Sequence, residues 1–386
     1  MGLTYRLGFR VKCIVRSSRV ALPSLALFAS CVAHAAWYPQ YVYETVPPFA
    51  TDGERRLLEY IPVPKAERPW DICVSLPHLK DAYWLGVDYG VVEEAKRQGI
   101  KLHVFEAGGY ANLQLQIEQI EACVAKGAQA VVVGAVSTSG LNTLVKSLTS
   151  RKIPVIDLVN GISSPYITAK SQVPFNEMGE AIGKYLAKRH PRGSIKTKVA
   201  WLPGPEGAGW VSAANKGFMD ATSWSALEIL PPVYGDTGKQ VQGDLIRSVL
   251  SHNPDVSYIV GTGVTAEVGV GILKELHKEG TIKLLSFYMT PGVYDAIRGG
   301  QVLASPVDFM AIQGRIAIDQ AVRALEGKAL HSDVGPVVFT VDNDNIRRFK
   351  IDDFLAPPSF SATLEVNPPS LNSNGANSGA RKGGSK

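Results

Sequence analysis

Residues 130–159, AVVVGAVSTSGLNTLVKSLTSRKIPVIDLV, hold two apolar runs separated by a segment with helical spacing. The first run, 130–133, has no polar residue, and the second, 154–159, has only Asp157. Strands this apolar are typical of a parallel sheet that is covered by helices on both faces. With a helix expected from about Ser139 to Arg151, the stretch predicts a β-α-β unit.

The same alternation precedes this unit. A short apolar strand is expected at 73–76 and the next strand at 101–105, and each is followed by apolar residues three or four positions apart, the spacing of a buried helix face. Gly99 and Gly127 end these two helices. Four such repeats predict a doubly wound parallel sheet.

The pattern restarts after residue 160. Further strands are expected at 199–202, 227–233, 256–260, 283–287 and 302–305, with helices between them. A chain of 386 residues is also too long for one compact core. We therefore expect an α/β fold with two lobes, each a doubly wound parallel sheet flanked by helices, and a cleft between them. We assign residues 70–160 and 288–307 to the amino-terminal lobe, and residues 161–287 and 308–345 to the carboxy-terminal lobe.

Two segments are expected to lie outside the core. Residues 37–69 are rich in Pro, Tyr and charged residues, which indicates an extended amino-terminal arm. Residues 356–386 consist largely of Pro, Ser, Asn and Gly, a composition that predicts a disordered tail because it buries little apolar surface.

Residues 1–36 resemble a secretory signal peptide. Five basic residues and no acid precede the apolar run 20–29, and small residues follow it. The run is too short to span a bilayer as a helix, so a membrane anchor is the less favoured alternative. We predict export to the periplasm after loss of residues 1–36; FASC at 28–31 leaves lipidation at Cys31 as a second alternative.

The net charge gives no indication of a nucleic-acid partner. The chain carries +5 in total, and the first 36 residues account for all of it, so the rest is close to neutral. Beyond that segment only Cys73 and Cys123 remain, and both are expected near the same face of the first sheet. In an oxidising compartment they form either a disulfide or two buried thiols.

Catalytic and metal-binding motifs are absent from the sequence. It contains no GxSxG, HExxH, GxxxxGK[ST] or CxxC motif, and the GTG at 261–263 lacks the third glycine of a dinucleotide-binding loop. We therefore expect neither catalysis nor a metal or cofactor.

Aromatic and acidic residues cluster where the expected strands end. In doubly wound sheets, ligands bind beyond the carboxyl ends of the strands. The candidate ligand-binding residues at these corners are Asp81, Tyr83, Trp84, Tyr110, Phe175, Trp210, Tyr288 and Asp308. Aromatic faces attract methylated ammonium groups, and a carboxylate complements their charge. Two alternatives remain: Tyr83 and Trp84 pack locally on the first helix, or Asp81 serves only as its N-cap.

Five stretches carry a family resemblance: LKDAYW (79–84), EAGGY (106–110), LVN (158–160), LPGP (202–205) and SFY (286–288). In this order and spacing they resemble the TorT family of periplasmic trimethylamine N-oxide sensors, which have the type I periplasmic binding protein fold. The resemblance covers about residues 68–350. It implies an aromatic cage of Tyr83, Trp84, Tyr110 and Tyr288 beside Asp81, and a disulfide, since both cysteines match the family's pair.

Two positions depart from the family. The family often has Trp where this chain has Phe175, and it tends to have a small residue in the segment that contains Trp210. The resemblance further implies a partner, the ectodomain of a membrane sensor histidine kinase. The main alternative is a sugar-type solute-binding protein of an ABC transporter, and an enzyme on the same scaffold is a third hypothesis.

Overall fold

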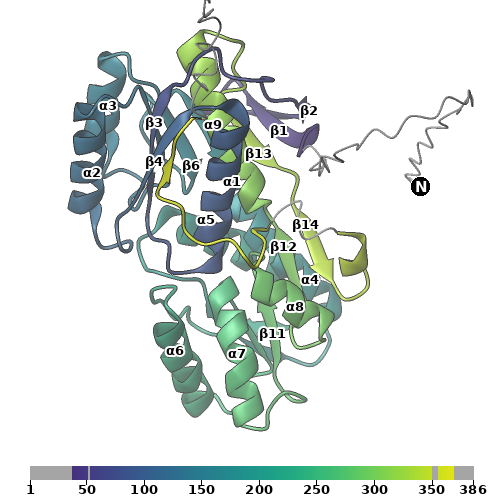
Figure 1. Cartoon of the computed structure of the whole chain (residues 1–386). Helices are drawn as coiled ribbons and strands as arrows, with labels where there is room; N and C mark the ends of the chain where they lie inside the picture. Colours follow the sequence, from purple (N-terminus) through teal and green to yellow (C-terminus); the bar gives the residue numbers. More distant parts are fainter. Residues whose placement is uncertain (1–36, 51–52, 350–354, 369–386) are drawn as a thin grey trace, which may run out of the picture. The chain divides into compact units, whose positions relative to one another are not determined.

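The computed structural model describes residues 37–50, 53–349 and 355–368. The expected signal peptide, with Cys31, and residues 369–386 lie outside this part of the chain. The described chain contains two large sheets that are each covered by helices, as the sequence predicts, and a small two-stranded sheet (Figure 1). No helix in the described ranges is long and apolar enough to cross a membrane.

The first lobe is built on a nine-stranded sheet. Its strands, in spatial order, are β15 (Glu365–Val366), β4 (Lys101–Glu106), β3 (Asp71–Leu76), β5 (Ala130–Val133), β6 (Val155–Val159), β7 (Ala169–Gln172), β13 (Asp333–Pro336), β1 (Gln40–Val46) and β2 (Glu54–Tyr60). The strands from β4 to β13 are parallel, whereas β15, β1 and β2 pair antiparallel with their neighbours.

Helices cover both faces of this sheet. On one face lie α1 (Ala82–Gln98) and α9 (Met310–Glu326), and on the other lie α2 (Leu113–Ala125) and α3 (Asn142–Ser150) (Figure 1). Successive side chains of a strand point to opposite faces, so Ile72 and Val74 pack in the cluster with α1 while Cys73 packs with α2. Cys73 forms a disulfide with Cys123 of α2, which confirms the predicted bridge.

The second lobe has a four-stranded parallel sheet. Its strands, in spatial order, are β11 (Lys283–Ser286), β10 (Tyr258–Gly261), β8 (Thr197–Leu202) and β9 (Leu227–Ile229). Its helices are α4 (Phe175–Arg189), α5 (Gly209–Thr222), α6 (Lys239–His252), α7 (Gly263–Glu275) and α8 (Pro291–Arg298). A small ladder of β12 (Ala304–Val307) and β14 (Phe339–Asp342), followed by the 3-10 turn η1 (Ile346–Arg348), completes it.

The predicted lobe boundaries were wrong at the first crossing, because β7 at 169–172 pairs with β6 in the first sheet and not in the second lobe, and they were also wrong in the returning segments. Residues 288–307 remain with the second sheet, because α8 packs on α7 and Val302 bridges to Leu284 of β11. Residues 310–336 return to the first lobe, where α9 packs on α1 and β13 pairs with β7. The chain thus crosses back near Asp308, later than the predicted crossing, because the short strand after Val302 pairs with β14 and not with the first sheet.

The two segments expected outside the core also contribute strands to it. Residues 40–46 and 54–60 pair as the antiparallel strands β1 and β2, in which Val42 and Tyr60 are buried and the Tyr60 hydroxyl donates to Asp319 Oδ2 at 2.6 Å. Val366 of β15 is buried against β4, and the amide of Thr363 donates to Asp88 Oδ2 at 2.9 Å. The arm is therefore not an isolated extension, and residues 356–368 do not belong to a disordered tail.

Candidate ligand-binding pocket

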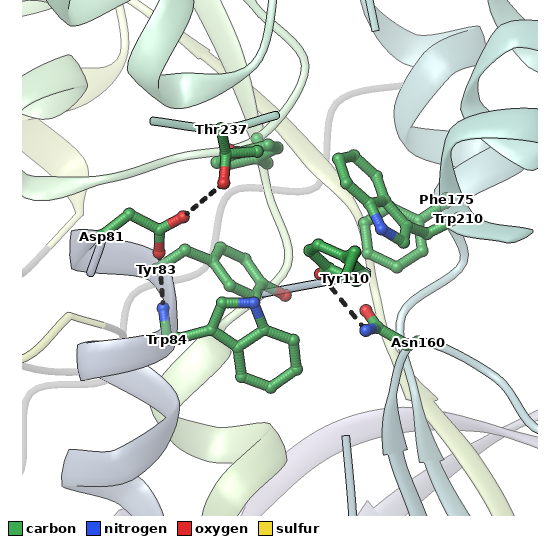
Figure 2. Close-up of a pocket in the computed structure, with 9 residues that line it drawn as sticks. Asp81, Tyr83, Trp84, Tyr110, Asn160, Phe175, Trp210 and Thr237 are labelled. Carbon is green, nitrogen blue, oxygen red and sulfur yellow. Dashed lines mark hydrogen bonds between the residues drawn. The ribbon is translucent and has the colours of Figure 1, made fainter. Parts of the chain in front are cut away.

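A small pocket lies between the two lobes. The first lobe contributes Asp81, Tyr83, Trp84, Tyr110 and Asn160, and the second contributes Phe175, Trp210, Thr237 and Tyr288 (Figure 2). Its free space is about 20 Å³, far below the roughly 300–1,000 Å³ of pockets for drug-sized ligands. All residues predicted for the site except Asp308 line this pocket, so the structure brings together corners that are far apart in sequence.

Asp81 occupies the turn between β3 and α1. One of its oxygens accepts a hydrogen bond from the Trp84 amide at 3.1 Å, so it is the N-cap of α1. The other accepts from the Thr237 hydroxyl of the second lobe at 3.2 Å. Burial raises the pKa of Asp81 to about 6, although both hydrogen bonds act in the opposite direction. The carboxyl group therefore caps a helix and also faces the pocket.

Tyr83 is oriented by a hydrogen bond to Asp308. Its hydroxyl donates to Asp308 Oδ2 at 2.5 Å, and its ring lies 5.2 Å from the ring of Tyr288 across the pocket. Asp308 itself is fully buried, and burial raises its pKa to about 6. Asp308 is not among the residues that line the pocket; it orients Tyr83, and a direct contact with the ligand stays a prediction.

Trp84 lies in the first turn of α1, almost completely buried. Its ring stands at 77° to that of Tyr83, with 5.8 Å between the ring centroids. At Gly134, just after β5, a Cβ atom would lie 2.7 Å from Cη2 of Trp84. Only a glycine at this strand end leaves room for the indole, so the loop and the ring fit each other.

Asn160 and Thr237 are lining residues that were not among the predicted site residues. Asn160 Nδ2 donates to the carbonyl of Ala135 at 2.7 Å and to the Tyr110 hydroxyl at 3.3 Å. Its position directly after β6 is the signal that could have identified it, because it also ends the stretch LVN. Thr237 lies in a loop before α6, where no strand-end pattern marks it.

The second lobe supplies three rings. Phe175 begins α4, Trp210 lies in the first turn of α5, and Tyr288 follows β11. The rings of Phe175 and Trp210 are 5.6 Å apart, and Trp210 is 6.0 Å from Tyr110 of the first lobe. Aromatic rings from both lobes therefore meet in one continuous cluster.

Polar contacts lie next to the lining residues in sequence. Lys80 of the first lobe forms an ion pair with Asp236 of the second, with 2.7 Å between Nζ and Oδ1. His78 is buried beneath Asp81, and burial together with the charge of Lys80 lowers its pKa to about 4. His78 is therefore neutral at pH 7, and Asp81 is the one ionisable acid among the lining residues.

The arrangement suits a compact ligand with a diffuse positive charge. Six of the lining residues are aromatic, and neither arginine nor lysine is among them. Aromatic faces carry negative electrostatic potential, which attracts cations and polarised N-methyl groups. A pocket this small and this apolar has few groups for the hydroxyls of a sugar ring.

Residues 72–329 match the family described as periplasmic binding protein domain. The periplasmic protein TorT of Escherichia coli (strain K12) is 35% identical over 297 residues, which are 77% of this chain and 84% of TorT.

Two solved structures are also similar. An ABC transporter solute binding protein from Bradyrhizobium sp. BTAi1 with bound bis-tris is 54% identical, covers 86% of this chain and 99% of its own, and has a TM-score of 0.76. TorT in complex with the TorS sensor domain, in the presence of TMAO, is 33% identical, covers 76% and 99%, and has a TM-score of 0.71. The two-lobed α/β fold of the type I class is thereby confirmed, and the chain belongs to the periplasmic binding protein family.

Proposed function

We propose that this protein binds trimethylamine N-oxide, or a related methylated amine, between its lobes and signals through the ectodomain of a membrane sensor histidine kinase. One observation carries the proposal: the pocket is small, its walls are aromatic, and its one ionisable acid, Asp81, stands without a basic neighbour among the lining residues. The cage of Tyr83, Trp84, Tyr110 and Tyr288 surrounds the N-methyl groups, and Phe175 and Trp210 close it from the second lobe.

The chemistry of related proteins supports this ligand class. TorT was crystallised with the TorS sensor domain in the presence of TMAO. The Bradyrhizobium protein, more similar in sequence, was crystallised with bis-tris, a tertiary amine whose protonated nitrogen is a bulky cation. Trimethylamine N-oxide, and bis-tris when it is protonated, carry positive charge on a substituted nitrogen, and aromatic faces attract such a charge.

Closure of the lobes is the proposed mechanism. The ligand contacts side chains of both lobes, so it binds the closed conformation more tightly than an open one and shifts the population toward closure. Closure changes the relative position of the two lobe surfaces, and a partner that contacts both surfaces reads the ligand state. A kinase ectodomain that touches both lobes is such a partner.

We also propose that the protein works in the periplasm. The family is periplasmic, and the disulfide between Cys73 and Cys123 suits an oxidising compartment. Residues 1–36 then act as the signal peptide, with lipidation at Cys31 as the alternative. Mass spectrometry of protein purified from the periplasm distinguishes the two, because lipidation retains Cys31 and adds acyl mass.

Titration calorimetry of the mature protein tests the ligand. We expect saturable heat with trimethylamine N-oxide and none with ribose. Trp84→Ala should weaken N-oxide binding by about 100-fold or more, because it removes a desolvated π face that closes one wall. Trp224→Ala is the control, since Trp224 is 78% exposed and lies outside the pocket. Saturable ribose binding without a response to the N-oxide would contradict the proposal, and catalytic loss of the N-oxide would indicate an enzyme.

A transport role is the second candidate function. The Bradyrhizobium structure that is 54% identical is described as an ABC transporter solute binding protein. Adding the purified kinase ectodomain with and without trimethylamine N-oxide separates the two roles. Ligand-dependent binding to the ectodomain supports signalling, whereas uptake of labelled ligand that depends on this protein supports transport.

A further inference from the structure

We propose that the indole N–H of Trp210 is the hydrogen-bond donor for the oxide oxygen of the ligand. The inference rests on the proposed function and narrows it, because it selects dipolar N-oxides over ammonium ions that carry no oxygen. It follows from one buried polar group in the pocket whose hydrogen bond is not made within the described chain.

Trp210 is 5% exposed, and its Nε1 has no acceptor among the described residues. Other indole nitrogens of the protein are paired: Trp37 donates to Glu94, Trp70 donates to Glu326, and Trp201 donates to Asn215. Buried donors are paired in the great majority of cases, and an exception calls for a specific explanation. A ligand acceptor is such an explanation, since Trp210 lines the pocket.

The position of the indole is fixed by its surroundings. Gly204, in the loop after β8, has φ +117°, and a Cβ atom there would lie 2.6 Å from Cη2 of Trp210. The ring also packs on Phe175 and on Phe287, whose centroid is 6.0 Å away. Figure 2 shows the indole nitrogen on the edge of the ring that faces Tyr110 and Asn160, toward the inside of the pocket.

The pocket has polar groups of opposite character at its two ends. In Figure 2 the carboxylate of Asp81 lies at one end and the indole of Trp210 at the other, with aromatic rings between them. Asp81 accepts hydrogen bonds and favours positive charge, whereas the indole N–H only donates and favours a negative oxygen. A ligand with a positive nitrogen and a negative oxygen satisfies both ends, and an amine N-oxide is a compact molecule of this kind.

Trp210→Phe tests the donor because it keeps a ring and removes the N–H. Calorimetry with trimethylamine N-oxide and with tetramethylammonium separates the loss of the N–H from the change of the ring. We expect the affinity for trimethylamine N-oxide to fall about 10- to 100-fold, as for a lost hydrogen bond to a charged acceptor. The affinity for tetramethylammonium should stay within about 2-fold, since this ion has no oxygen and forms no hydrogen bond with the N–H of the wild-type protein.

Trp201→Phe is the matched control. It also removes a buried indole N–H, but this one donates to Asn215 at 3.0 Å and the ring stacks on Phe218 outside the pocket. We expect it to leave the affinity for both probes unchanged. In ¹⁵N-labelled protein, the Trp210 indole resonance should move downfield with the N-oxide and much less with tetramethylammonium.

The outcomes separate this inference from the proposed function. If the wild-type protein binds the N-oxide and Trp210→Phe binds it equally well, the inference is wrong and the function stands. If Trp210→Phe loses both probes by the same factor, the ring and not the N–H contributes, and the inference is again wrong. If the wild-type protein binds no N-oxide, the proposed function fails and the inference fails with it.

Discussion

The two halves of the pocket differ in how completely their polar groups are paired before a ligand arrives. In the first lobe, Asp81 caps α1, Tyr83 donates to Asp308, and Asn160 donates to Ala135. In the second lobe, Phe175 has no polar group and the N–H of Trp210 has no acceptor in the described chain. Thr237 of the second lobe is paired with Asp81, but the Trp210 N–H leaves one unpaired donor in the described part of that lobe, so we expect the second lobe to change more than the first when a ligand binds.

The same contrast extends to the lobes themselves. The first lobe has nine strands and a disulfide, whereas the second has a four-stranded sheet and no disulfide among the described residues. A preorganised site binds without first ordering its side chains, and this saves free energy of binding. The predictions below test whether the first lobe is the rigid reference and the second lobe the responsive part.

The largest expected effect follows removal of the disulfide. Replacing Cys73 and Cys123 by Ala opens a loop of sequence separation 50, which lowers the free energy of unfolding by about 4 kcal/mol in the chain-entropy model. Urea unfolding measures it, and wild-type protein under reducing conditions should match the variant. The affinity for trimethylamine N-oxide should change little, because Cys73 lies on the α2 face of the sheet, outside the pocket. If the free energy of unfolding fell by less than about 1 kcal/mol, the disulfide would not account for a more rigid first lobe.

Neutralising Asp308 should give an intermediate effect that depends on pH. Burial raises its pKa from about 3.8 to about 6. A raised pKa favours the folded state while the group is protonated, and this contribution is lost as the pH rises from about 4 to 6. Asp308→Asn avoids that loss, so its stability relative to wild type should increase by about 2 kcal/mol between pH 4 and pH 7.

Chemical denaturation of both proteins at these two pH values measures the difference. Because an amide oxygen still accepts from the Tyr83 hydroxyl, the affinity for trimethylamine N-oxide should be nearly unchanged. An equal stability difference at both pH values would contradict the expected titration of Asp308. A large loss of affinity would show that the first half of the pocket needs the charge as well as the hydrogen bond.

The smallest effect is expected at the Lys80–Asp236 ion pair. This pair joins the lobes, but both side chains are more than one-third exposed. Exposed pairs contribute about 0–1 kcal/mol, so Lys80→Ala should weaken ligand binding by at most about 5-fold, and less at high salt. Lys216→Ala removes an exposed pair within α5 and is the control. A larger loss of affinity would show that closure of the lobes depends on the Lys80–Asp236 pair and not on the ligand contacts.

The repeating strands and helices could be predicted from the sequence because they leave local patterns. The strand 130–133, the helical stripes and the aromatic corners all depend on spacing over a few residues. What the sequence did not reveal depends on distant partners. Val302 belongs with the second sheet because it bridges to Leu284, and β13 belongs with the first because it pairs with β7. Thr237 is placed at the pocket by its hydrogen bond to Asp81.

The amino-terminal arm, residues 37–69, is a second case in which the structure depends on distant partners. Its alternating residues are compatible with strands, yet a composition rich in Pro and charge favoured an extended segment. Only the buried contact between Tyr60 and Asp319, more than 250 residues away in sequence, shows why the hairpin is stable. Asp308 is a related case: its place at a strand end suggested a ligand contact, but its partner is Tyr83.

The late return of the chain to the first sheet has a consequence for biosynthesis. Helix α9 and strand β13, residues 310–336, are the last large parts of the first core, although that core begins at residue 40. An emerging polypeptide cannot finish its amino-terminal half until nearly all of it has been made. Completion of the first core therefore waits for residues 310–336, whereas the second sheet, residues 197–286, is built from one continuous segment that is made earlier.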